Sequence, residues 1–349
     1  MTQLVDWDLA VKTARVLSKL GPATSVADAG AAVSDLRAHA TEAIGLVAEF
    51  TGLTGATNPP VHVVDRTGWC QANVAGMREL LDPLSGKLSR DPSWLARNVG
   101  SRVAGTQAGA VLGYLSGRVL GQFEVFGAHY GRLLLVAPNI IEAERELRLQ
   151  PNEFRMWVCL HEAAHAAQFG GVPWLRGHFL DEINRFVSVG EPEETTAETV
   201  ARFAQQTRRT VELFADSVRD SGSHTILDLL TSPQQRAVVD RLTAIMTLLE
   251  GHADYVMDHV GERVIGDVAA IRHRFDRRRN AAGPLHRVTK RLLGMDVKLA
   301  QYERGSGFVE AVVGAAGSDT FARVWEGPAN LPTMEEIEDP DRWIARIRG

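Results

Sequence analysis

The segment His161-Glu162-Ala163-Ala164-His165 has the residue types and the spacing of a metal site that activates water. On an α-helix, residues i and i+4 lie on the same face, so both imidazoles can reach one ion. Glu162 lies one step round the helix, where its carboxylate can take a proton from a metal-bound water. The alternative is two structural histidines beside a solvated glutamate, and a five-residue motif alone does not exclude it.

The flanking sequence predicts that this motif lies within a buried helix from about residue 151 to 169. Apolar side chains surround the motif at helical spacing, and its alanines are strong helix formers. Gly170, Gly171 and Pro173 provide a stop signal. This context favours the chemical interpretation of the motif.

The motif does not continue to a third histidine, because Gly171 stands where the extended pattern requires one. Glu250 and Asp254 lie one turn apart on an apolar helical segment, where burial is costly without a metal or a hydrogen-bond partner. Glu250-x-x-Ala253-Asp254 resembles the ExxAD element of the gluzincins. That resemblance implies that Glu250 is the third zinc ligand and that Asp254 orients a ligand histidine. A solvated acidic edge is the alternative.

Other residues compete for these roles. Glu182 and His252 are alternative third ligands, and Glu182 follows His165 by a short separation of the kind seen in many gluzincins. A tetrahedral intermediate also needs a donor for its oxyanion. His178 and Tyr255 are the candidate catalytic donors, with Arg176 and His252 as further choices, and the sequence does not decide among them.

Composition limits the remaining possibilities. The chain has 349 residues, of which 45% are hydrophobic, which is enough for a sizeable core. A net charge of −5 gives no sign of nucleic-acid binding. The basic run 272–279 reads as a solvated helix end. Cys70 and Cys159 suit a reducing, cytoplasmic location, and the N-terminus has no signal-peptide pattern.

Gly109, Gly113, Gly117 and Gly121 form a stripe at every fourth residue. The uncharged run around it is too short to span a membrane. We therefore expect a helix over 100–126 that packs closely on another helix, with the alanine-rich face of 161–167 as its partner.

The whole chain reads as mainly α with a small β-sheet. Strands are expected at 61–65 and 133–138. The expected helices are 8–20, 28–52, 67–81, 195–220, 224–231, 233–260 and 262–278. Residues 284–325 are expected to be helical with a turn at 305–307, and 326–340 to be extended before a short helix around Trp343. We expect a single domain over 1–349, which allows two lobes, 1–170 and 171–349.

The chain resembles a family of zincin-like metallopeptidases common in actinobacteria. The matching segments are 113–123, 135–140, 157–169, 172–175, 250–254, 301–305 and 325–332. One branch of this family is associated with biosynthesis of a deazaflavin coenzyme, and the chain looks closer to that branch. The resemblance implies a zincin fold with the HExxH helix beside a strand that holds an extended substrate. Leu133–Val136 is the natural candidate for that strand.

Together these features predict a zinc-dependent hydrolase, a metallopeptidase that cleaves a peptide or amide bond. His161, His165 and Glu250 would hold Zn²⁺, and Glu162 would act as general base. The expected partner is a peptide or amide substrate, without nucleic acid or membrane, and the oligomeric state is open. The alternative is a non-catalytic zincin-fold binding or scaffold protein linked to deazaflavin coenzyme metabolism.

Overall fold

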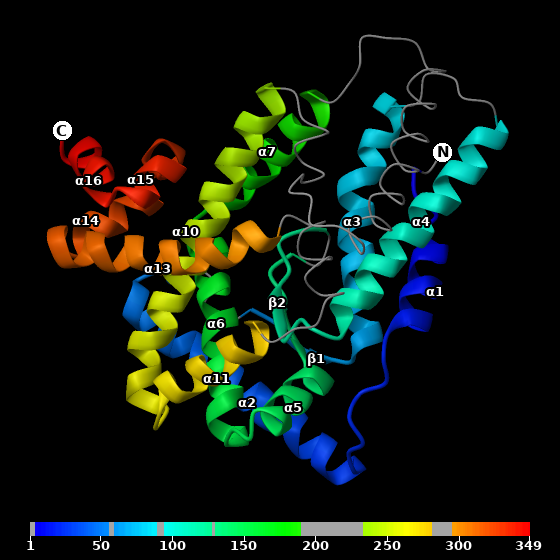
Figure 1. The fold of residues 1–349 in the computed structure, drawn as a ribbon, viewed down its shortest axis with the longest axis horizontal. Helices are drawn as coiled ribbons and strands as arrows, with labels where there is room; N and C mark the ends of the chain where they lie inside the picture. Colours follow the sequence, from blue (N-terminus) through cyan, green and yellow to red (C-terminus); the bar gives the residue numbers. More distant parts are fainter. Residues whose placement is uncertain (1–3, 56–58, 89–93, 128–129, 190–232, 281–294) are drawn as a thin grey trace. The chain divides into compact units, whose positions relative to one another are not determined.

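A computed structural model describes residues 4–55, 59–88, 94–127, 130–189, 233–280 and 295–349 (Figure 1). The chain is mainly helical with one small sheet, which confirms the predicted fold class. It divides into two compact units, Met1–Gly171 with Val256–Arg274, and Val172–Tyr255 with Phe275–Gly349. The expected helices at 195–220 and 224–231 lie outside the described residues. None of the helices in the described ranges is long and apolar enough to cross a membrane.

The first unit contains a three-stranded sheet and the helices that cover it. Its strands are β1 (Val61–Val64), β2 (Gly121–Phe123) and β3 (Leu133–Val136). Its helices are α1 (Trp7–Leu17), α2 (Val26–Thr51), α3 (Arg66–Leu88), α4 (Trp94–Ser116), α5 (Ala137–Glu146), α6 (Pro151–Gly171), the C-terminal part of α10 (Pro233–Val264) and most of α11 (Val268–Asn280). The strands at β1 and β3 were predicted from their β-branched and apolar runs.

The strand order is β1-β3-β2, with β1 parallel and β2 antiparallel to β3. The fully buried strand β3 is therefore central, and the expectation that Leu133–Val136 holds a substrate is wrong. Both of its edges already carry a partner strand. Within the described residues, β2 is the outer strand on the antiparallel side.

The two faces of the sheet meet different helices. Leu134 and Val136 share a core with α1, α3 and α4, including Trp69 and Leu112. Alternate residues of a strand point to opposite faces, so Leu133 and Leu135 point the other way, toward the side on which α6 packs against β2 and β3. The α6 helix also packs along α2.

The expectation of one helix over 100–126 that contains the whole glycine stripe is wrong. The α4 helix ends at Ser116, where the buried Asn139 amide donates to the carbonyls of Ser116 and Val119 (2.7 and 2.6 Å) and satisfies the last turn. Gly121 instead begins β2. The glycines of the stripe that lie on α4 pack against α1: a Cβ at Gly113 would lie 2.9 Å from the Leu17 Cβ. Only Gly121, outside that helix, lies against the 161–167 segment.

The second unit is built from helices around a separate apolar core. These are α7 (Leu175–Val189), the N-terminal part of α10, α13 (Met295–Ala316), α14 (Ser318–Ala322), α15 (Met334–Glu338) and α16 (Pro340–Arg348), with short 3-10 turns at Arg323–Trp325 and Pro328–Asn330. The expectation of an extended 326–340 segment is wrong, because Thr333 and Glu336 form a capping box that begins α15. The expected short helix is α16, and its Trp343 is fully buried.

The expected turn at 305–307 is also absent, and α13 runs through it without a break. Gly305 lies against Gly251 of α10, and a Cβ at Gly305 would lie 3.0 Å from the Gly251 Cα and would overlap the Thr247 carbonyl. The glycine therefore allows two helices to approach closely, a role that resembles a turn signal in sequence.

Candidate metal centre

The HExxH segment lies on α6, within the predicted boundaries to about two residues. Pro151 occupies the first turn, where its missing N–H costs nothing, and the helix ends at Gly171. Most residues from Phe154 to Phe169 are buried, whereas His161 and His165 are half-buried. The helix thus presents two imidazoles, one turn apart, on its less covered side.

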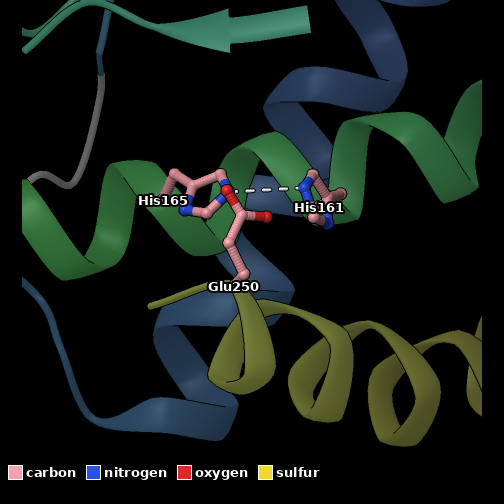
Figure 2. A group of neighbouring side chains, drawn as sticks. All are labelled: His161, His165 and Glu250. Carbon is pink, nitrogen blue, oxygen red and sulfur yellow. Dashed lines mark hydrogen bonds between the residues drawn. The ribbon is translucent and has the colours of Figure 1, made fainter. Parts of the chain in front are cut away.

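His161, His165 and Glu250 form a group whose ligand atoms all lie within 4.8 Å of one another. Figure 2 shows the Glu250 carboxylate directed toward the two imidazoles. The Nε2 atoms of the histidines are 3.3 Å apart. Two imidazoles bound to one tetrahedral zinc at about 2.0–2.1 Å would place these nitrogens about 3.3 Å apart. The donor set and its spacing therefore fit a divalent metal such as zinc.

Gln168 orients His165 and was not among the residues singled out from the sequence. Its fully buried side-chain oxygen lies 3.0 Å from Nδ1 of His165. Because an amide oxygen can only accept, Nδ1 carries the proton and Nε2 is left to face the group. The available signal was the i+3 spacing from His165, which places both side chains on one face of α6.

Glu162 directly follows His161 on α6 and is 6% exposed. It packs against β2, because a Cβ added at Gly121 would lie 2.5 Å from the Glu162 Cγ and 2.7 Å from its Oε1. No side chain larger than hydrogen fits there without moving the carboxylate. Gly121 therefore holds a place for Glu162 that the sequence alone does not reveal.

The structure puts Glu182 to a different use from the one considered for it. Its carboxylate is 1% exposed and accepts hydrogen bonds from Arg185 (2.7 Å) and from two nitrogens of Arg241 (2.8 and 2.9 Å). It is not part of the metal-binding group. A buried carboxylate with two guanidinium partners is a structural ion pair, so the geometry favours Glu250 as the third ligand.

His252 also has an apolar setting rather than a place in the group. Its ring stacks on Phe321 at 5.5 Å between centroids and meets Trp325 edge-on at 5.1 Å. The residue is 5% exposed. It thus contributes to the packing of the second unit.

The remaining candidates lie on the second unit. The half-buried Arg176 and His178 are in the first turns of α7, and the His178 ring meets Trp174 edge-on at 5.9 Å. Asp254 lies one turn after Glu250 on α10. The next residue, Tyr255, is half-buried, and burial together with the charge of Glu310 raises its pKa. The Tyr255 hydroxyl therefore stays protonated at neutral pH and can donate a hydrogen bond.

A buried helix that presents two histidines one turn apart, grouped with a glutamate distant in sequence, is typical of proteins that bind a divalent metal. The chain belongs to the zincin-like metallopeptidase family, whose model matches residues 5–344. It is also similar to a protein of known crystal structure from Chloroflexus aurantiacus, described as a "putative hydrolase" with a novel fold. The two proteins share 30% identity over 99% of each chain, with a TM-score of 0.69. No curated protein matches the chain.

Proposed function

We propose that the protein is a zinc-dependent hydrolase that cleaves a peptide or amide bond. The observation that carries this proposal is the His161–His165–Glu250 group, together with a glutamate, Glu162, on the same buried helix as the two histidines. Two imidazoles and a carboxylate are one of the ligand sets of catalytic zinc, which keeps a further position open for water. Membership in the zincin-like metallopeptidase family supports the same reaction class.

Glu162 has the central role in the proposed reaction. Zinc, when bound, lowers the pKa of its water and polarises the substrate carbonyl. Glu162 takes a proton from that water and later returns it to the leaving amine. Its packing against Gly121 limits the positions that the carboxylate can adopt, which keeps the proton acceptor in place for both steps.

Supporting residues complete the proposed site. Gln168 already fixes the ring of His165, so we assign the orienting role of Asp254 to His161. Tyr255 is the first choice for the oxyanion donor, because a phenol hydroxyl is a hydrogen-bond donor at neutral pH and this residue directly follows Asp254 on α10. His178 is the second choice.

The β2 strand replaces β3 as the proposed binding edge for an extended substrate. The Val136 N–H donates to the Leu120 carbonyl and the Glu124 N–H donates to the Arg132 carbonyl (both 2.8 Å). In an antiparallel ladder these groups alternate, so Leu120 and Glu124 face β3 and the backbone groups of Gly121 and Phe123 face outward. A substrate strand paired with β2 would therefore run next to Glu162.

The decisive experiment combines metal analysis with a digest of a peptide mixture. Glu162→Gln keeps the shape of the side chain but removes its basicity, so we expect bound zinc to persist and turnover to fall about 10²–10⁴-fold. Glu250→Ala should lower the zinc content itself. Glu49→Gln, an exposed change in the same unit, is the matched control. Undiminished cleavage by a pure Glu162→Gln preparation would refute the assignment.

A zinc-loaded wild-type protein that cleaves nothing in a broad peptide and amide mixture would instead support the non-catalytic alternative. The link to deazaflavin coenzyme metabolism remains a prediction from the resemblance. A cytoplasmic location remains a prediction too, supported by Cys70 and Cys159, which are buried and form no disulfide.

A further inference from the structure

A cavity of about 560 Å³ lies in the first unit, on the face of the sheet opposite α6. Its walls are α3 and α4, with Met77 from one helix and Ala104 and Leu115 from the other. Gln122 of β2 closes one side. Ligand sites typically have volumes of roughly 300–1,000 Å³, so the cavity is large enough to hold a ligand group.

Apart from the exposed Gln107, the polar side chains in the wall already have hydrogen-bond partners. The Gln122 side-chain oxygen accepts from Trp69 Nε1 (2.8 Å) and from the Asn73 amide (3.1 Å), and Gln122 Nε2 donates to Asn73 Oδ1 (3.1 Å). The Glu124 carboxylate is bonded by two nitrogens of Arg132. A ligand in this cavity therefore contacts apolar side chains and polar groups that are already hydrogen-bonded. Such a cavity favours an apolar ligand group over a polar one.

The cavity is open to solvent along α4. Gln107 and Val111, one turn apart, both line it, and both are exposed, Val111 to 41%. An apolar group can therefore enter from outside without unfolding the surrounding helices.

The geometry of β2 connects this cavity to the proposed reaction. Gly121 points toward Glu162 and Gln122 points to the opposite face, into the cavity wall. Residues directly opposite in neighbouring strands carry their side chains on the same face, with Cβ atoms about 4.5–5.5 Å apart. A substrate residue opposite Gln122 therefore directs its side chain to the cavity, while its neighbour, opposite Gly121, faces the α6 side.

We propose that this cavity is a specificity pocket for a large apolar side chain, such as Phe, Leu or Met, of an extended peptide paired with β2. The selected residue is the immediate neighbour of the one aligned with Gly121. The inference rests on the proposed function for the identity of the ligand, but the pocket binds whether or not the bond is cleaved.

The test is affinity selection of capped random heptapeptides on the zinc-loaded Glu162→Gln protein, with the bound peptides sequenced by mass spectrometry. We expect enrichment of Phe, Leu or Met over Gly and Asp at one position by about tenfold or more. Ala104→Phe fills the cavity and should remove that enrichment. Val103→Phe changes the residue before Ala104 on α4, which is outside the cavity lining, and should leave the enrichment unchanged.

Zinc content and circular dichroism verify that each variant is folded, and Ala72→Leu from the α3 wall is a second filling variant if Ala104→Phe is not. No binding, no apolar preference, or a preference that survives both filling variants would overturn the inference. Turnover by the unsubstituted protein is measured separately. Cleavage without apolar selection would refute only the proposed pocket, and selection without cleavage would refute only the proposed hydrolase activity.

Discussion

The two faces of the sheet in the first unit differ in how closely side chains pack against β2. On the α6 face, Phe123 stacks on Phe169 (6.2 Å between centroids) and meets Tyr130 edge-on (6.1 Å), while Gly121 leaves no space beside Glu162. On the opposite face, α3 and α4 leave the cavity beside Gln122. Three consecutive residues of β2 thus contribute to a close-packed face and to a hollow one.

This difference separates two requirements that an enzyme must meet. A proton acceptor has to keep its position, because a displacement of about 1 Å can cost about 100-fold in rate. A pocket for a side chain has to leave volume empty. Alternation along β2 allows both, since neighbouring residues of one strand face opposite sides.

Truncation of the apolar side chains should expose the contrast most strongly. Phe123→Ala removes a buried ring from the packed face, and we expect a loss of about 3–5 kcal/mol in the free energy of unfolding. Leu115→Ala, a half-buried residue at the cavity, should cost only about 1 kcal/mol, because its surroundings are already open. Urea denaturation of both variants measures the difference. Equal losses would contradict the contrast between the faces.

Addition of a single methyl group at Gly121 should next show how closely the α6 face holds Glu162. In Gly121→Ala the new Cβ meets the Glu162 side chain, so we expect a roughly 100-fold lower kcat with zinc still bound. Gly45→Ala in α2, where an added Cβ meets nothing within 4 Å, is the matched control, and its kcat should stay within about threefold of the wild-type value. Peptide turnover and zinc content are the measurements. An unaffected Gly121→Ala enzyme would mean that Glu162 has freedom that the packing does not suggest.

Ionisation of the two cysteine thiols should give the smallest effect, a fall in the free energy of unfolding at alkaline pH. Burial, followed by the charge of Glu162, raises the pKa of Cys159 in α6 far above that of a free thiol, and burial raises the pKa of Cys70 beside the cavity wall. Unfolded thiols ionise near pH 8.5, so the folded state holds these protons longer. Stability is therefore complete below about pH 8.5 and falls above it, by up to about 1.4 kcal/mol per pH unit for each thiol.

Denaturation between pH 8 and 10 checks this direction, and Cys159→Ala should flatten the slope. Thiol labelling of the native protein at pH 8 adds a comparison of the faces. Both cysteines should react slowly, with Cys70 ahead of Cys159, because the Cys70 Sγ lies against Leu112, a residue of the cavity wall. Faster labelling of Cys159 would indicate that the α6 side opens more readily.

The sequence predicted the elements whose signals are local. The α6 helix combines strong helix formers with a glycine stop, and its i, i+4 histidines follow from helix geometry alone. The β1 and β3 strands have apolar and β-branched runs ended by turn signals. The predicted fold class, mainly helical with a small sheet, follows from these elements together.

The errors arise where one residue type serves two purposes. Gly121 continues a helical stripe in sequence but begins a three-residue strand, because Asn139, distant in the chain, ends α4 at Ser116. The centrality of β3 depends on that unrecognised strand. Likewise, no local pattern shows that Glu182 is paired with Arg241. This is a tertiary contact between residues 59 positions apart, and a single sequence does not encode it at a fixed spacing.

The crossing of α10 and α13 has a consequence for the register of the ligand-bearing helix (Figure 1). Each residue step turns a helix by about 100°, so a rotation of α10 by one residue would bring Glu250 or His252 against α13 in place of Gly251. Neither side chain fits where a bare Cβ would overlap the Gly305 backbone. The close approach of Gly251 and Gly305 therefore fixes the rotation of α10 about its own axis, and with it the direction in which Glu250, the residue before Gly251, leaves the helix.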